Sequence, residues 1–212
     1  MKRCLLALVL AAALPAAAGN AAEEDSVVAG AREFVAGIGD RTMAVLTTPS
    51  STEDEIKIGL GELLLEGVDF ELLGRFALGR RGRRAKGSRF EEYVQLFAAH
   101  IIDMAAERFA EFGVQGYSIT KARKMPNGDV IVSTEIYRES GEPFEAGWRV
   151  RLRDNRYRIN DMLVEGYSVG IHFRNSFERL IDGGLDGIVR KLRSQTAGSP
   201  ALRLAKQRLA IN

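Results

Sequence analysis

The feature that most constrains the fold is a series of four short segments in the second half of the chain, in which apolar and polar residues alternate. They cover residues 114–122, 129–138, 144–153 and 156–164, and turn-forming residues separate them. Alternation with a period of two predicts strands that bury one face. Parallel neighbours would need crossovers of a dozen or more residues, so these short connections require an antiparallel meander.

The first half of the chain is predicted to be helical, because its apolar residues recur three and four positions apart. Thr52-x-x-Glu55 and Ser88-x-x-Glu91 have the spacing of capping boxes, and Asp69 is placed to cap a short helix between them. Helices followed by a meander predict an α+β protein. We expect a helical layer packed on one curved antiparallel four-stranded sheet, an NTF2-like cone with an apolar pocket.

The N-terminus has the pattern of a secretory signal peptide. Lys2 and Arg3 precede an apolar run at residues 5–14, which is too short to span a bilayer. Small residues then place cleavage between 18 and 22, so residues 1–22 would be the signal peptide. A single domain over residues 23–193 and a flexible basic tail over residues 194–212 are expected to follow.

Removing the signal peptide changes two global properties of the chain. Cys4 is the only cysteine, so the mature protein would have no disulfide and no cysteine metal site. Loss of Lys2 and Arg3 leaves 28 basic residues against 28 acidic ones, and nothing then favours nucleic acid as a partner.

One local charge asymmetry remains, because no acidic residue lies between Leu72 and Phe90. The basic residues of this stretch are Arg75, Arg80, Arg81, Arg83, Arg84, Lys86 and Arg89. A solvated basic loop is the plainest interpretation. Arg80, Arg81 and Arg84 are also candidates for contact with an anionic lipid headgroup or an acidic partner protein.

The segment Gly166–Gly170 matches the G-x-S-x-G signature of a serine hydrolase, with Ser168 as the nucleophile. That signature belongs to a parallel sheet, and its histidine follows an acidic residue further along the chain. Here His172 follows Ser168 by four positions with no acid between them. We therefore interpret Ser168 as a helix N-cap and Gly166 as part of a tight turn, with a serine esterase as the alternative.

Asp161 lies in the fourth predicted strand, on the same alternation as Ile159. A carboxylate on a core face can act as a general base, but a base without a second positioned polar group does not make a site. Pairing with Arg174 or another nearby arginine is the simpler interpretation. His100 and His172 share no metal-ligand spacing, so we expect no metal and no cofactor.

An apolar pocket between the sheet and the helices is the remaining candidate site. Side chains expected to face it from both layers are Phe97, Ile101, Met104, Val132, Ile136, Trp148, Val150, Ile159 and Phe173. An ordinary hydrophobic core has the same stripes, so the residues by themselves favour a plain core and leave the pocket as the alternative.

Several spaced motifs occur in a recognisable order. They are Val68-Asp69-Phe70, Ala77-Leu78-Gly79-Arg80, Trp148-x-Val150, Tyr157-x-Ile159-x-Asp161, Glu165-Gly166-x-Ser168, Arg174-x-x-Phe177 and Gly184-x-Asp186-Gly187-Ile188. With these motifs the chain resembles the MlaC, or toluene tolerance, family of periplasmic phospholipid-binding proteins. It departs from the family at Arg81, where an aromatic residue is usual, and at Tyr157, where tryptophan is common.

The resemblance implies a soluble, monomeric periplasmic carrier that has no enzymatic activity and no cofactor besides its lipid cargo. Such a carrier would move phospholipid between an outer-membrane lipoprotein complex and an inner-membrane ABC transporter with an MCE-domain ring. A hopanoid or another polycyclic lipid is the alternative cargo. Structural roles would fall to Asp161, Gly166, Ser168, Arg174 and Phe177.

Overall fold

The computed structural model describes residues 16–179 and 184–209. Its elements are α1 (Ala16–Leu46), α2 (Glu53–Gly67), α3 (Phe70–Ala77), α4 (Ser88–Phe112), β1 (Val114–Lys124), β2 (Val130–Arg138), β3 (Phe144–Arg153), β4 (Arg156–Val164), β5 (Tyr167–Ser168), α5 (Val169–Glu178), α6 (Gly184–Gln195) and α7 (Pro200–Arg208). The strands form one antiparallel sheet in the order β1-β2-β3-β4-β5. The α+β class and the meander are confirmed, and the two-residue β5 makes five strands instead of four.

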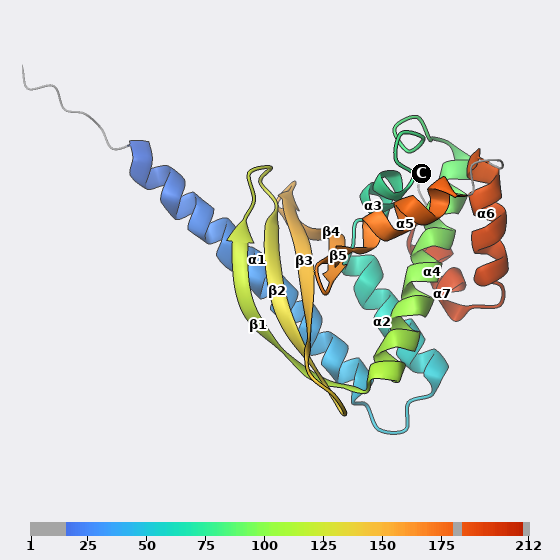
Figure 1. Ribbon diagram of the computed structural model, residues 1–212, viewed down its shortest axis with the longest axis horizontal. Helices are drawn as coiled ribbons and strands as arrows, with labels where there is room; N and C mark the ends of the chain where they lie inside the picture. Colours follow the sequence, from blue (N-terminus) through green and yellow to red (C-terminus); the bar gives the residue numbers. More distant parts are fainter. Residues whose placement is uncertain (1–15, 180–183, 210–212) are drawn as a thin grey trace, which may run out of the picture.

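The long helix α1 crosses one face of the sheet, and its first turns extend beyond the sheet (Figure 1). The remaining helices gather past the edge formed by β4 and β5 (Figure 1).

The turn between β3 and β4 explains why these strands pair so closely. Asp154 and Asn155 both have positive φ, 49° and 58°, as a two-residue hairpin turn requires and as Asp and Asn tolerate.

A bulge in β4 changes which side chains share a face. Arg149 pairs with Asp161 and Val150 pairs with Ile159, so Asn160 is an extra residue without a cross-strand partner. The prediction that Asp161 shares the core face of Ile159 was therefore wrong. Alternation along the sequence is a guide to strand faces only where the pairing has no inserted residue.

Two of the three helix starts predicted in the first half of the chain are confirmed. Thr52 and Glu55 form the reciprocal capping box of α2, and the Asp69 carboxylate accepts from the Leu72 N–H at 2.9 Å to cap α3. The box expected at Ser88 does not form, because α4 begins at Ser88 itself and its N-cap is Gly87. Gly87 has a φ of 73°, a conformation that favours glycine at the cap and leaves Ser88 inside the helix.

The C-terminal segment differs from the flexible tail that we expected. Residues Pro200–Arg208 form α7, and its Ala201 and Ala205 have 0% exposure. Ser199 caps the helix and donates to the Asp103 carboxylate of α4 at 2.8 Å. A nine-residue helix is marginal in isolation, so packing against α2 and α4 is what stabilises it.

The predicted signal peptide falls mainly on residues 1–15, which lie outside the described residues, and it remains a prediction. Residues 16–22 form the first turns of α1. Across residues 16–179 and 184–209, no helix is long and apolar enough to cross a membrane.

Candidate binding cavity

An apolar cavity of about 70 Å³ lies between α1, α2 and the inner face of the sheet. Its walls are Val35, Ile38, Gly39, Thr42, Met43, Leu60, Leu63, Leu64, Phe109, Val114, Tyr117, Thr134, Ile136, Trp148 and Ile159. Thr134 does not make this lining polar, because its hydroxyl donates to the Ala146 carbonyl at 3.0 Å and accepts from the Trp148 indole at 3.1 Å. Most of the lining is apolar, so the space suits apolar groups.

Tyr117 of β1 holds one end of this wall by packing on Gly39 of α1. A Cβ at Gly39 would meet the Tyr117 ring at 2.4 Å, so the close approach requires glycine. The Tyr117 hydroxyl has two acceptors for its single proton, the Ala36 carbonyl at 2.9 Å and the Asp40 carboxylate at 2.7 Å. Burial and the bond to Asp40 raise the pKa of Tyr117 to about 12, so the hydroxyl stays protonated as a donor.

A second tyrosine holds α1 nearer its N-terminus in the same way. A Cβ at Gly30 would meet the Tyr157 hydroxyl at 2.2 Å, and that hydroxyl donates to the Val27 carbonyl at 3.3 Å. The Tyr157 ring also stacks on Phe34 with centroids 6.1 Å apart. Helix α1 thus approaches the sheet closely at two glycines, each under a tyrosine ring, and Arg32 and Glu24 of α1 add hydrogen bonds to β1.

The structure brings three of the nine predicted pocket residues to this cavity, namely Ile136, Trp148 and Ile159. The other six are Phe97, Ile101, Met104, Val132, Val150 and Phe173, which belong to the hydrophobic core or pack against it. Sequence reasoning did not identify the lining from α1 and α2. Their apolar stripes were visible, but nothing in the sequence shows which stripe meets the sheet.

Phe97 and Phe173 belong instead to a tightly packed group that we call the aromatic cluster, formed with Tyr93 and Phe177. Ring centroids lie 5.5 Å apart for Tyr93 and Phe97, and 5.0 Å apart for Phe97 and Phe173. Phe177 lies 6.0 Å from Phe97 and 5.8 Å from Phe173. Edge-to-face and stacked geometries of this kind fill space as a core does.

The corner after β4 is organised around a buried carboxylate. Asp161 is 3% exposed, and it accepts from the Ser168 hydroxyl at 2.6 Å and from the backbone N–H groups of Met162 and Gly170. Ser168 also accepts from the Ile171 N–H at 3.0 Å, which confirms it as the N-cap of α5. Gly166 has a φ of 78° in the tight turn, as predicted.

The expected pairing of Asp161 with Arg174 does not form. Arg174 lies beside Gly79 and 3.6 Å from Glu178, and Asp161 is already satisfied by hydroxyl and backbone donors. The contacts of Ser168 are those of a helix cap rather than of a nucleophile beside a base. In the described part of the chain, no three His, Cys, Asp or Glu side chains are grouped as a metal site.

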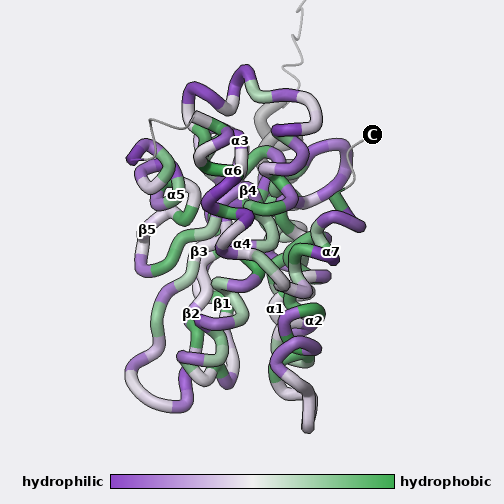
Figure 2. The backbone as a smooth tube through the Cα atoms, turned by 90° about the vertical axis from the view of Figure 1, so that its right-hand side faces the viewer, coloured by the Kyte–Doolittle hydropathy of each residue, from purple (hydrophilic) through white to green (hydrophobic). Residues whose placement is uncertain are grey.

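The basic loop between α3 and α4 lies far from the cavity. Arg80, Arg81 and Arg84 are exposed there, in a hydrophilic stretch at the end of the molecule near α3 (Figure 2). The loop enters α4 at Ser88, whereas Phe109 of the cavity is near the opposite end of that helix, about 30 Å away at 1.5 Å per residue. The structure does not bring these three arginines to the cavity.

Three comparisons with known proteins bear on the identity of the chain. The model of the MlaC protein family matches residues 37–194. A phospholipid-binding protein from Ralstonia solanacearum, solved in complex with a phospholipid, superposes with a TM-score of 0.70 at 21% identity, covering 79% of this chain and 97% of that one. No curated protein matches the chain.

Proposed function

The chain belongs to the MlaC family, and on that premise we propose that it is a periplasmic carrier that binds phospholipid and shuttles it between membrane complexes. The partners would be an outer-membrane lipoprotein complex and an inner-membrane MCE-domain ABC transporter. No catalytic step is part of this proposal. The chain would act by removing acyl chains from water and releasing them to a docked partner.

The observation that carries the proposal is the apolar cavity between α1, α2 and the sheet. The Ralstonia protein with this fold holds a phospholipid, which supports a lipid-sized ligand for the fold. The cavity walls offer acyl chains an apolar surface on which the only described hydroxyl groups are those of Thr42, Tyr117 and Thr134. Such a lining excludes a charged headgroup, which would stay at the mouth.

The expected binding energy suits a carrier rather than a sensor. Each buried methylene contributes about 0.8 kcal/mol, so two acyl chains of some fifteen carbons would contribute on the order of 20 kcal/mol. Spontaneous release into water would be very slow at that value. Transfer therefore requires a partner that offers the chains an equally dry path.

The cavity must enlarge before it can hold a lipid. Its volume is about 70 Å³, whereas pockets for ligands of drug size or larger begin at roughly 300 Å³. We expect α1 to be the wall that moves, because side-chain contacts join it to the sheet. Tyr117 and Tyr157 donate to its carbonyls, and Arg32 of α1 donates to the Ile119 carbonyl of β1. We expect lipid uptake to separate α1 from the sheet.

The test is mass spectrometry of an organic extract of the purified protein, compared for Ile136→Trp and Ile136→Leu. Ile136 lines the cavity and is 7% exposed, so tryptophan would fill the space that the lipid needs. Leucine conserves volume and serves as the matched control. We expect stoichiometric phospholipid with the parent and with Ile136→Leu, and at least about a fivefold loss with Ile136→Trp.

Other outcomes identify the alternatives. A polycyclic lipid in the extract would identify a hopanoid or a similar lipid, and not phospholipid, as the cargo. If the folded parent protein yields no lipid, the proposal is contradicted. The alternative would then be an adaptor that joins partner proteins and carries no lipid. Hydrolysis of activated esters that is lost in Ser168→Ala would instead favour the esterase.

A further inference from the structure

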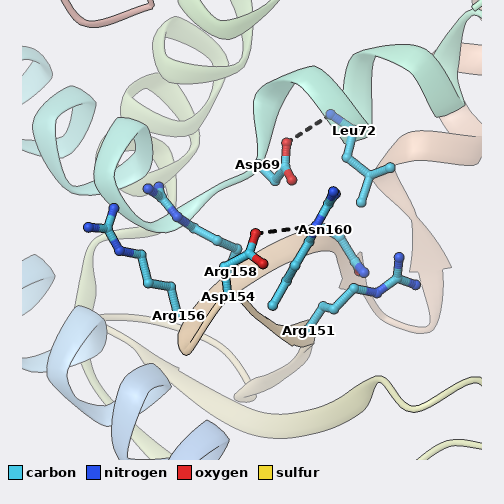
Figure 3. A pocket seen from close by; sticks show the side chains of 8 residues that line it. Asp69, Leu72, Arg151, Asp154, Arg156, Arg158 and Asn160 are labelled. Atoms are coloured by element: carbon cyan, nitrogen blue, oxygen red, sulfur yellow. Dashed lines mark hydrogen bonds and ion pairs between the residues drawn. The ribbon is translucent and has the colours of Figure 1, made fainter.

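A second pocket, of about 450 Å³, lies where the turn between β3 and β4 faces the start of α3 (Figure 3). We call it the arginine pocket, and its lining residues are Asp69, Leu72, Arg151, Arg153, Asp154, Arg156, Arg158 and Asn160. Four arginines and two aspartates give this lining a positive balance. The chain as a whole has a net charge of only +2.

The strand register places these arginines directly opposite one another. Arg151 pairs across the hairpin with Arg158, and Arg153 pairs with Arg156. Like charges in directly opposed cross-strand positions are destabilising. Two successive arginine pairs at one hairpin are therefore a cost to the fold that binding an anion would offset.

Acidic residues of the protein neutralise only part of this charge. Arg151 donates to the Asp129 carboxylate at 2.6 Å, and this carboxylate is almost wholly buried. Arg158 donates to the Glu66 backbone carbonyl, and Arg153 lies 3.6 Å from the exposed Asp154. Within the described part of the chain, the Arg156 guanidinium has neither a hydrogen bond nor an ion pair.

A buried, unpaired acceptor belongs to one of the lining residues. Asn160 is 7% exposed, and its Oδ1 has no hydrogen-bond partner. Asn160 is the inserted residue of the β4 bulge, and bulges commonly redirect a side chain beside a functional site. This oxygen has almost no accessible surface, so it marks a strained point of the bulge and is not a contact offered to a ligand.

The arginine pocket is separate from the apolar cavity. Arg158 lines the former and the next residue, Ile159, lines the latter. Successive strand residues point to opposite faces, so the two sites lie on opposite sides of β4. A group bound by the arginines is therefore not the end of an acyl chain held in the cavity.

We propose that the arginine pocket binds the phosphate group of a phosphate ester, with the arginines contacting the phosphate oxygens. Guanidinium groups suit phosphate because they donate two parallel hydrogen bonds while carrying charge. A phosphatidylglycerol headgroup and free glycerol phosphate share this chemistry. The site does not depend on the cavity holding lipid.

The test measures binding of sn-glycerol 1-phosphate by calorimetry and of phosphatidylglycerol vesicles by flotation, with phosphatidylcholine vesicles as the neutral comparison. The variant is Arg153→Gln with Arg156→Gln, two exposed positions whose replacement removes no buried contact. The matched control is Arg81→Gln with Arg84→Gln, which removes the same charge from the other basic region. Circular dichroism verifies that both variants fold.

We expect the Arg153/Arg156 variant to bind at least about tenfold more weakly, while the control changes little. If the Arg153/Arg156 variant binds both probes more weakly, the site is supported. If it binds only the vesicles more weakly, the phosphate belongs to a membrane lipid. Equal weakening in both double variants, or no binding of either probe by the parent, would overturn the proposal, whatever lipid the extract contains.

Discussion

The aromatic cluster and the apolar cavity are both built from apolar side chains, yet they differ in how the space between those side chains is filled. In the cluster, Phe97 has 0% exposure and touches rings on three sides with centroids 5.0–6.0 Å apart. In the cavity, side chains from α1, α2 and the sheet leave about 70 Å³ empty. The first region is a finished core, and the second is the place where the protein can open.

The difference follows from what attaches each wall. Helices α4 and α5 interlock through rings that fill one another's gaps. Helix α1 approaches the sheet over two glycines, and most of its directional contacts with the sheet are side-chain hydrogen bonds from Tyr117, Tyr157 and Arg32. Such a wall has less ring packing to lose on moving than two interlocked helices have.

The largest effect expected from this comparison is on the stability of the aromatic cluster. Phe97→Ala should lower the free energy of unfolding by about 4 kcal/mol, because it removes a ring at the centre of the cluster and leaves a cavity. Phe97→Leu, which keeps most of the volume, should cost about 1 kcal/mol. Urea denaturation measures both values. A cost for Phe97→Ala no larger than that of Phe97→Leu would mean that the cluster is as adaptable as the cavity.

A smaller effect is expected at the cavity wall, where two glycines of α1 provide a matched pair. Gly39→Ala should destabilise by about 2 kcal/mol, since its Cβ would lie 2.4 Å from the Tyr117 ring and force α1 outward. A Cβ at Gly37 would meet nothing within 4 Å, so Gly37→Ala should instead stabilise the helix by up to about 1 kcal/mol. Thermal unfolding measures both changes in stability, a decrease for Gly39→Ala and an increase for Gly37→Ala. Equal effects would show that α1 is not held by this contact.

The smallest effect is a pH dependence at the edge of the aromatic cluster. His100 lies 5.6 Å from the Phe173 ring, and burial lowers the pKa of this imidazole, with Lys191 adding to the lowering against the opposing charges of Asp103 and Glu107. Because the folded state resists protonation, stability is complete above about pH 6.5 and falls as the pH drops below it.

Stability measured at pH 7.5 and pH 5.5 checks this expectation. The loss between the two values should shrink in His100→Gln. His172→Gln is the control, since that ring lies exposed on α5. An unchanged loss in His100→Gln would place the pH dependence elsewhere.

Local patterns were sufficient for most of the fold. Alternation and short turns predicted four strands and their antiparallel order, and the side chains of Thr52, Asp69 and Ser168 predicted three helix caps. Each of these features depends on residues within a few positions of one another. Ser88 is not a helix cap, because Gly87 takes the N-cap position with a positive φ and Ser88 becomes the first residue of α4.

Features that join distant segments were not predictable in the same way. The bulge at Asn160 inverted the expected face of Asp161, and α7 became ordered only through its contacts with α2 and α4. Three of nine predicted pocket residues reached the cavity, because an apolar stripe looks the same whether its partner helix fills the space or leaves it open. The arginine pocket likewise needs the hairpin register and the start of α3 together.

The sequence by itself determined the elements, the meander and the motifs of the family, since these follow from side-chain spacing and turn chemistry along the chain. The tertiary structure alone decided where apolar surface stays unfilled and where arginines accumulate on one face. Both depend on distances between segments that are dozens of residues apart. Residue spacing sets which side chains an element can present, and only packing sets what each of them meets.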